Sequence, residues 1–215
     1  MIRGILVIRF LVLFLLLILV GCERVLIKDN SMQPTLSPGD AFYVHRYRKD
    51  NHLRSKVFVF YFPYGDYSSS YHICSGNIFI KRCVGVPGDT ITVSNGVVLN
   101  NGNIILPLRP GTDLTLNHSD KDVITNRPGY REANRYNLPD IYIPKRGDQI
   151  KVDDYSLHLY RRIFVFETGK VPVYGDYYTF EENYFFSCGD NISDSWDSRF
   201  WGFVPESYII GYINL

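Results

Sequence analysis

The apolar segment near the N-terminus is the feature that most constrains this chain of 215 residues. Residues 5–22 contain a single charge, Arg9, and residues 10–20 are wholly apolar. In hydrocarbon every backbone polar group must bond within its own segment, so such a run is predicted to cross a bilayer as a helix. Arg3 and Arg9 favour a cytoplasmic N-terminus. Residues 1–24 are therefore predicted to be a single-pass anchor in the cell (inner) membrane, with the remaining chain on the extracytoplasmic side.

A cleaved signal peptide is the alternative interpretation of the same segment. The tetrapeptide Leu19-Val20-Gly21-Cys22 is similar to a bacterial lipoprotein cleavage site, with Cys22 as the lipid carrier. We favour the uncleaved anchor on its length and flanking charges. Both interpretations tether the following domain to the same face of the membrane.

Beyond the anchor the sequence predicts a mostly β fold, because 15% of all residues are aromatic and many of the rest are Val or Ile. Strands are predicted at 42–45, 57–62, 78–84, 90–93, 97–100, 104–106, 149–152, 184–187 and 208–213. Asn95-Gly96 and Asn101-Gly102 predict hairpins, because such turns require positive φ at both central positions. One helix is predicted over 154–168, and residues 109–139 are predicted to form a polar surface excursion.

Charge and cysteine usage exclude several classes of protein. A net charge of +1 without a long Lys/Arg run argues against nucleic acid as a partner. The four cysteines form no CxxC pair and the five histidines no HExxH motif, so neither a metal site nor a cofactor is expected. No GxSxG motif indicates a Ser-His-Asp hydrolase. A Cys74–Cys83 disulfide and two free thiols both stay open.

Two segments contain candidate catalytic side chains. Ser31 precedes Pro34 by three positions, and its hydroxyl is either an ordinary turn group or a nucleophile close to the membrane. Lys81 lies in the apolar strand 78–84, on the face predicted to carry Phe79 and Cys83. Such a lysine is either an exposed edge residue or a desolvated amine, and desolvation lowers the pKa toward values at which the amine is a base.

A third segment, residues 187–205, is dense in small polar residues between apolar strands. It is either a surface loop with an unimportant Asp–Arg pair or a scaffold that orients a catalytic base. Its aromatic residues Trp196, Phe200 and Trp201 either pack in the core or lie at the membrane interface.

Together these segments resemble the bacterial type I signal peptidase family, the leader peptidases with a Ser-Lys dyad. Residues 31–36 are similar to the family's nucleophile segment, 57–63 to the strand beside its substrate groove, 81–89 to its general-base segment and 189–204 to its last signature. Each segment alone is weakly diagnostic. Their order behind an N-terminal apolar segment makes the combination specific.

The resemblance implies a signal-peptidase-like β-barrel or β-sheet catalytic core with a β-rich insertion. In this sequence the core would comprise residues 25–94 and 181–215, and the non-catalytic insertion residues 95–180. The implied activity is that of a monomeric, membrane-bound serine endopeptidase that removes signal peptides from secreted preproteins after small residues.

The resemblance also implies roles for individual residues. Ser31 would be the nucleophile and Lys81 the general base. The support residues would be Ser195 bonded to the Lys81 amine, the ion pair Asp197–Arg199, and Asp190 paired with Arg82. The oxyanion hole would use the Ser31 backbone and Asn30, and the substrate groove Met32, Pro34, Val57, Val59 and Phe79.

Three positions depart from the family's pattern. Asp29 stands where a Ser or Gly is usual, and an ionised carboxylate cannot donate a hydrogen bond to an oxyanion. Ser55-Lys56 replaces the usual Gly-Asp before the groove strand, and Ile192 replaces a basic residue. A catalytically inactive relative, or a lipoprotein that only binds peptides, is therefore the alternative function. A self-cleaving repressor-type protease fits less well, because the apolar segment precedes Ser31.

Overall fold

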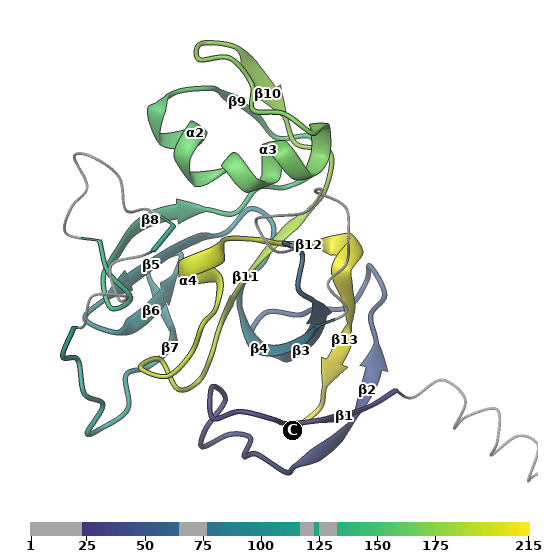
Figure 1. Cartoon of the computed structure of the whole chain (residues 1–215), viewed down its shortest axis with the longest axis vertical. Coiled ribbons are helices and arrows are strands. Elements are labelled where there is room, and N and C mark those ends of the chain that lie inside the picture. The colour runs from purple at the N-terminus through teal and green to yellow at the C-terminus, as the bar shows by residue number, and fades with distance from the viewer. Residues whose placement is uncertain (1–22, 65–76, 117–122, 125–132) are drawn as a thin grey trace, which may run out of the picture.

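Three antiparallel sheets organise the part of the chain that the structure describes, residues 23–64, 77–116, 123–124 and 133–215 of a computed structural model (Figure 1). The largest is seven-stranded, in the order β1-β2-β13-β3-β4-β11-β12. Its strands are β1 (Glu23–Leu26), β2 (Ala41–Arg46), β3 (Val57–Tyr61), β4 (Ile78–Gly85), β11 (Tyr184–Cys188), β12 (Val204–Pro205) and β13 (Ile209–Ile213). The N- and C-terminal parts of the described chain thus meet in one sheet, which confirms the mostly β prediction.

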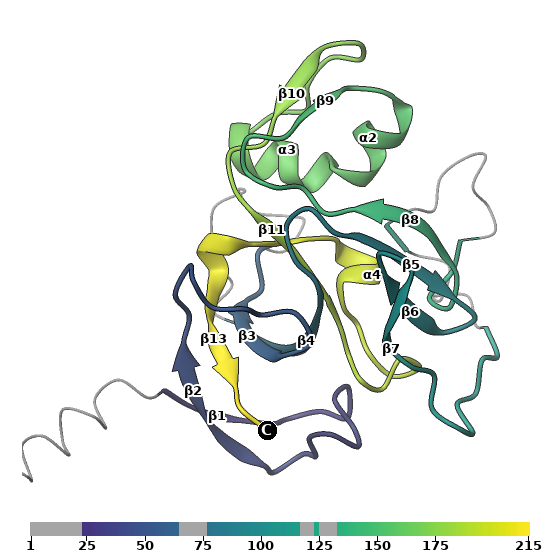
Figure 2. The same cartoon turned by 180° about the vertical axis from the view of Figure 1, so that it is seen from behind.

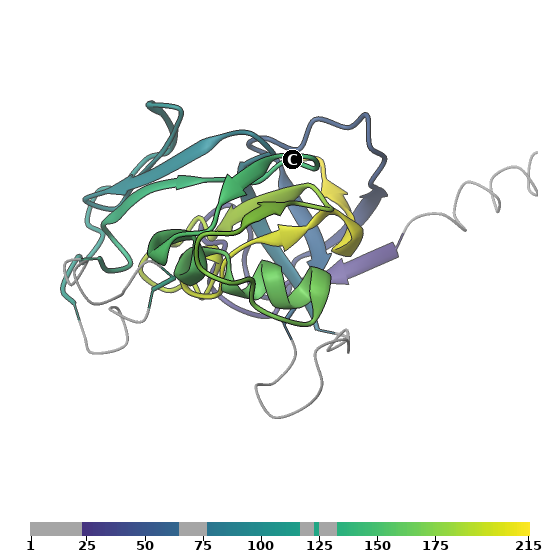
Figure 3. The ribbon, with the colours of Figure 1, turned by 90° about the horizontal axis from the view of Figure 1, so that it is seen from above.

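The second sheet has four strands in the order β7-β6-β5-β8. They are β5 (Thr90–Ser94), β6 (Val97–Asn100), β7 (Asn103–Leu106) and β8 (Leu138–Tyr142). Both predicted hairpin turns are confirmed: φ is 47° at Asn95 and 77° at Gly96, and 47° at Asn101 and 79° at Gly102. Figures 2 and 3 show this sheet beside the seven-stranded one.

The third sheet is a two-stranded ribbon of β9 (Gln149–Lys151) and β10 (Tyr177–Thr179). Two helices lie between these strands in the sequence. The prediction of one helix over 154–168 is corrected to two, α2 (Asp154–Leu159) and α3 (Arg161–Thr168). They are separated at Tyr160, where φ is −100° and ψ is 9°. Asp153 caps α2 by accepting from the Ser156 N–H at 2.7 Å. A further short helix, α4 (Ser198–Trp201), and a 3-10 turn at Glu206–Tyr208 also lie within the described residues.

The largest apolar core joins the first two sheets. Val84 of β4 and Phe186 of β11 pack in one buried cluster with Ile91 of β5 and Ile141 of β8. Predicting residues 109–139 as a surface excursion was wrong in part, because Leu138 begins β8 and Tyr136 is buried in this cluster. Apolar contacts with the core outweigh the polar composition around these positions. How the chain divides into a core and an insertion stays a prediction.

The predicted anchor falls mostly outside the described residues. Its last two positions, Glu23 and Arg24, belong to β1. Within the described ranges no helix has both the length and the apolar character needed to cross a membrane. Cys22 and Cys74 also lie outside the described residues, while Cys83 and Cys188 are buried free thiols.

Candidate active site

Ser31 lies in the excursion between β1 and β2, which backbone hydrogen bonds close at its base. The Ile27 N–H donates to Asp40 O at 2.9 Å, and the Gly39 N–H donates to Ile27 O at 3.0 Å. The next residue, Met32, is almost fully buried in an apolar cluster with Leu36 and strand residues. This packing holds the Ser31 side chain, which is 5% exposed, against the sheet.

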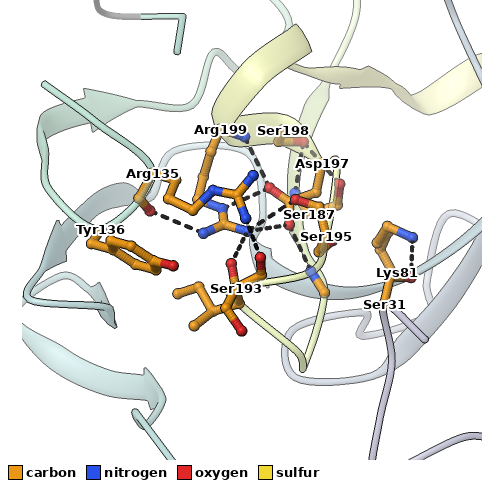
Figure 4. Close-up of polar contacts among 12 residues, drawn as sticks. Ser31, Lys81, Arg135, Tyr136, Ser187, Ser193, Ser195, Asp197, Ser198 and Arg199 are labelled. Atoms are coloured by element: carbon orange, nitrogen blue, oxygen red, sulfur yellow. Dashed lines mark hydrogen bonds and ion pairs between the residues drawn. The ribbon is translucent and has the colours of Figure 1, made fainter. Parts of the chain in front are cut away.

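Lys81 lies in the middle of β4, directly opposite Phe58 of β3. Its side chain is 3% exposed, and its Nζ donates to Ser31 Oγ at 2.6 Å (Figure 4). The Nζ also donates to Ile80 O at 3.2 Å and lies 5.5 Å from the centroid of the Phe79 ring. The structure therefore brings together the two side chains predicted to form the dyad, although they are 50 positions apart in the sequence.

Burial sets the ionisation of the Lys81 amine. Desolvation lowers the pKa of Lys81 below its ordinary value and is the largest influence on it. The charges of Asp29 and Asp197 raise this pKa, and that of Arg199 lowers it, with a net lowering. A lysine of lowered pKa has more of the neutral amine at physiological pH, and a neutral amine can accept a hydroxyl proton.

The edge of β4 beside this pair is open along half its length. β11 pairs with β4 at Arg82, Cys83 and Gly85. Among the described strands, residues 78–81 of β4 pair with β3 alone. An unpaired strand edge presents backbone N–H and C=O groups that an extended peptide can bond.

A buried ion pair lies behind Lys81. Asp197, the N-cap of α4, and Arg199 are both 0% exposed. Arg199 donates from Nε to Asp197 Oδ1 at 2.8 Å and from Nη2 to Oδ2 at 2.9 Å. Burial raises the pKa of the Asp197 carboxyl. The Arg199 charge and the hydrogen bonds to the carboxylate lower this pKa by more, so the net shift is downward. The predicted pair is thus a fully desolvated, bidentate contact and not a surface one.

Gly189 links this ion pair to the Ser31 segment. Its N–H donates to Asp197 Oδ2 at 2.9 Å, and the N–H of Asn191 donates to Ser31 O at 3.0 Å. A Cβ atom at position 189 would overlap Ser31 O and Ser195 Oγ. Only glycine allows so close an approach, and the loop thereby fixes the Ser31 backbone.

Ser195 differs from its implied role. Its Oγ is buried and makes no hydrogen bond to the Lys81 amine. The Ser195 side chain acts on the Asp197 carboxyl instead and helps to lower its pKa. The amine donates to Ser31 Oγ and Ile80 O instead. Figure 4 shows Ser195 between Lys81 and the Asp197–Arg199 pair.

The structure forms the ion pair between Asp190 and Arg82. Arg82 donates from Nε at 2.6 Å and from Nη2 at 2.5 Å to the two carboxylate oxygens of Asp190. The Thr35 hydroxyl donates to the same carboxylate at 2.5 Å, a contact that sequence reasoning missed. Arg82 Nη1 also donates to Ser55 O at 2.6 Å, and Ser55 adopts the left-handed conformation with φ of 67°. The departure from glycine therefore leaves the turn in a conformation that glycine favours.

The implied oxyanion donor is occupied by a side chain of the same segment. The Ser31 N–H donates to Asp29 Oδ1 at 2.9 Å. Burial raises the pKa of the Asp29 carboxyl, but contacts with the Ser31 side chain and backbone and the Lys81 charge lower it, with a net lowering. Asn30 is exposed, and its backbone carbonyl accepts from the Gln33 N–H and from Asn191 Nδ2.

The predicted groove residues fall into three environments. Met32, Val57 and Val59 are almost fully buried in one cluster, and Pro34 is exposed. Phe79 is partly buried in a second cluster on the other face, where it packs on Trp196 and Trp201. Sequence reasoning missed Ile80, which is partly buried opposite Val59 and whose alternation along β4 is the signal that identifies it.

The aromatic residues of the last loop separate in the same way. Trp201 is fully buried and Phe200 partly so, whereas Trp196 is 53% exposed. Core packing therefore accounts for Trp201. Among the described residues no group of three or more His, Cys, Asp or Glu side chains is arranged to hold a metal ion.

Comparisons with known proteins point to one family. All of residues 1–215 match the sequence model described as "Signal peptidase, peptidase S26". The chain is 28% identical over 218 residues to signal peptidase I of Buchnera aphidicola subsp. Baizongia pistaciae, covering 89% of this chain and 68% of that protein. It is 29% identical over 204 residues to probable signal peptidase I-1 of Synechocystis, covering 94% and 74%. It is 26% identical over 213 residues to signal peptidase IB of Staphylococcus aureus, covering 97% and 85%.

Proposed function

The chain belongs to the S26 signal peptidase family, and on this premise we propose that it is a membrane-anchored serine endopeptidase that removes signal peptides from secreted preproteins. The observation that carries the proposal is the 2.6 Å contact between Lys81 Nζ and Ser31 Oγ. Both side chains are nearly excluded from water, the condition under which a lysine amine is a base at neutral pH.

The proposed reaction is acyl transfer in two steps. The neutral Lys81 amine accepts the Ser31 Oγ proton while Oγ bonds to the scissile carbonyl carbon, whose π electron pair moves to its oxygen. The carbon–nitrogen bond then breaks, and the Lys81 ammonium gives its proton to the departing amine of the mature protein. Lys81 next deprotonates a water that attacks the ester, and the proton returns to Ser31 Oγ as the signal peptide leaves as a carboxylic acid.

The open half of the β4 edge supports binding of the preprotein as an added strand. Residues 78–81 lead directly to Lys81, so a peptide paired there would lie beside the Ser31 hydroxyl. Met32, the residue after Ser31, packs with Val59 and Ile80 in one apolar cluster, and Val59 and Ile80 lie on the face of the sheet opposite to Lys81. Cleavage after small residues is proposed from the family alone.

The roles of the remaining residues follow from their contacts. Asp197 and Arg199 would hold the loop behind Lys81, and Asp190 with Arg82 would hold the Ser31 segment through Thr35. The anchor over residues 1–24 would place this site at the extracytoplasmic face of the membrane, where preproteins emerge. The proposed enzyme acts as a monomer without a metal or cofactor.

An inactive relative that binds peptides without cutting them is the second candidate. The observation in its favour is the Asp29 carboxylate on the Ser31 N–H, because that N–H is the implied oxyanion donor.

The decisive experiment uses the full-length protein in detergent micelles with a preprotein substrate. Ser31→Ala and Lys81→Met are each expected to lower kcat/KM by about 10³-fold or more, since each removes an obligatory proton-transfer partner. Ser94→Ala and Lys145→Met, at exposed positions away from the dyad, are the matched controls and should cleave like the wild type. Cleavage that survives in either dyad variant removes the assignment, and an inert wild type favours the peptide-binding alternative.

A further inference from the structure

Asp29 holds the one backbone donor that the proposed chemistry needs. The Ser31 N–H points to Asp29 Oδ1 at 2.9 Å, which satisfies this N–H within the nucleophile's own segment. In acyl transfer the carbonyl oxygen of the substrate becomes an anion, and a backbone N–H next to the nucleophile is a natural donor to it. The Asp29 carboxylate thus lies where that anion has to bind.

We propose that Asp29 is a positioning residue that closes the oxyanion site of the resting enzyme and is displaced by the substrate. This inference rests on the proposed function of Ser31 and Lys81. The carboxylate imitates the charge of the oxyanion and keeps the N–H oriented until a peptide arrives. Substrate binding must then exchange one hydrogen bond to an anion for another, so the closure lowers the rate without abolishing it.

The surroundings of Asp29 allow this exchange. Asp29 is exposed and Asn30 beside it is exposed, so its side chain can rotate into water without opening the core. The Ser31 backbone stays in place meanwhile, because Ser31 O accepts from the Asn191 N–H and packs against Gly189. The movement is confined to one side chain.

Asp29 also acts on the base through its charge. The charged groups that act on the Lys81 amine are Asp29 on the Ser31 segment and Asp197 and Arg199 on the last loop. Asp197 and Arg199 have opposite effects on the Lys81 pKa, whereas Asp29 has no cation of its own in that set. Removing the Asp29 charge therefore lowers the pKa of Lys81 and extends activity to lower pH.

The test compares Asp29→Ala with Asp29→Asn in the full chain. The alanine variant removes both the acceptor and the charge, and the asparagine variant removes the charge while keeping an oxygen for the Ser31 N–H. Preprotein cleavage is measured across pH. We expect Asp29→Ala to raise the plateau of kcat/KM about tenfold, the effect of one hydrogen bond to a charged group, and Asp29→Asn to raise it less. The acidic limb should move to lower pH in both variants.

A second measurement is independent of cleavage. In protein labelled with ¹⁵N-serine, the Ser31 amide shift is followed against pH in the Lys81→Met background, where the lysine no longer titrates. It should move as the Asp29 carboxyl titrates, and Asp29→Asn should abolish the movement. A Ser31 amide shift that does not change with pH would overturn the closure. A kcat/KM plateau of Asp29→Ala at or below that of the wild type would overturn it as well. An inert wild type with a responsive amide instead refutes the proposed peptidase and leaves the closing contact in place.

Discussion

Two aspartates act on the Lys81 amine, and their surroundings are opposite. Asp29 lies on the exposed Ser31 segment, which we call the front of the site, and Asp197 lies on the buried last loop, which we call its rear. Asp197 is 0% exposed and is bonded by Arg199 and the Gly189 N–H. Asp29 is exposed and accepts from the Ser31 N–H. Both carboxylates raise the pKa of the same lysine.

The difference separates two tasks of the site. Behind Lys81, the Arg199 cation offsets the Asp197 anion, so this region fixes geometry while adding little net charge. In front, the Asp29 carboxylate lies on an exposed side chain that can move, and no cation offsets its effect on the Lys81 pKa as Arg199 offsets that of Asp197. Burial then remains the main cause of the lowered Lys81 pKa. Changes behind the lysine should act on stability, and changes in front should act on rate and pH dependence.

The largest contrast is expected when both aspartates receive the same substitution. Asp197→Asn leaves the buried Arg199 cation without its anion and should cost about 3–5 kcal/mol of unfolding free energy. For a chain of this size the melting temperature then falls by roughly 6–20 °C. Asp29→Asn, at an exposed position, should change stability by less than about 0.5 kcal/mol. Thermal and urea unfolding in micelles measure both values.

The control for this contrast removes both members of the buried pair. Asp197→Asn combined with Arg199→Met should recover part of the lost stability, because no charge is then left unpaired in the core. If Asp29→Asn proved as destabilising as Asp197→Asn, the division between a structural rear and a movable front would be wrong.

The sequence located the residues at the rear of the site but not their surroundings. Lys81 in an apolar strand and Asp197 two positions before Arg199 are local patterns that left burial open, and the implied contact of Ser195 with Lys81 is not made. The two hairpins were equally local, since Asn-Gly pairs specify positive φ. Contacts over long sequence separations needed the fold: Thr35 reaches Asp190 across 155 positions.

The front and the insertion depended on details that periodicity does not carry. Asp29 was recognised as unable to donate, but its side-chain rotamer, and hence its bond to Ser31, follows from the local backbone. The helix break at Tyr160 has no Gly or Pro to mark it. Tyr136 lies in a polar stretch, yet it is buried in the largest core cluster, and its carbonyl accepts from the Gly96 N–H.

An intermediate effect is expected at the contact between the rear loop and the Ser31 segment. Gly189→Ala forces its Cβ against Ser31 O and Ser195 Oγ and should cost about 1–3 kcal/mol through overpacking. Because Ser31 moves with its carbonyl, kcat should fall further than KM changes. Asp194→Ala, at an exposed position of the same loop as Gly189, is the control and should leave kcat unchanged. An unchanged kcat in Gly189→Ala would show that the loop does not position Ser31.

Lys81 itself should show the cost of a buried amine. Its pKa is lower in the folded than in the unfolded state, so the unfolded chain binds the extra proton at neutral pH. Stability therefore rises as pH approaches the ordinary lysine pKa of 10.5 and falls as pH drops through the lowered pKa. Lys81→Met should remove this dependence and add about 0.5–2 kcal/mol at pH 7. Urea unfolding at several pH values checks it, and a pH slope unchanged from the wild type would mean that the amine stays protonated in the fold.

The smallest effect is expected at Ser55, whose carbonyl accepts from Arg82. Because Ser55 belongs to neither the front nor the rear of the site, its substitution is a reference for the two aspartates. A non-glycine residue in the left-handed conformation is strained, and Ser55 has φ of 67°. Ser55→Gly relieves that strain but adds freedom to the unfolded chain, so a net gain of at most about 1 kcal/mol is expected. The carbonyl that accepts from Arg82 is retained, and the pH profile of cleavage should match the wild type. A shifted acidic limb in this variant would show that the Arg82–Asp190 network also tunes the base, and that charge control is not confined to the front.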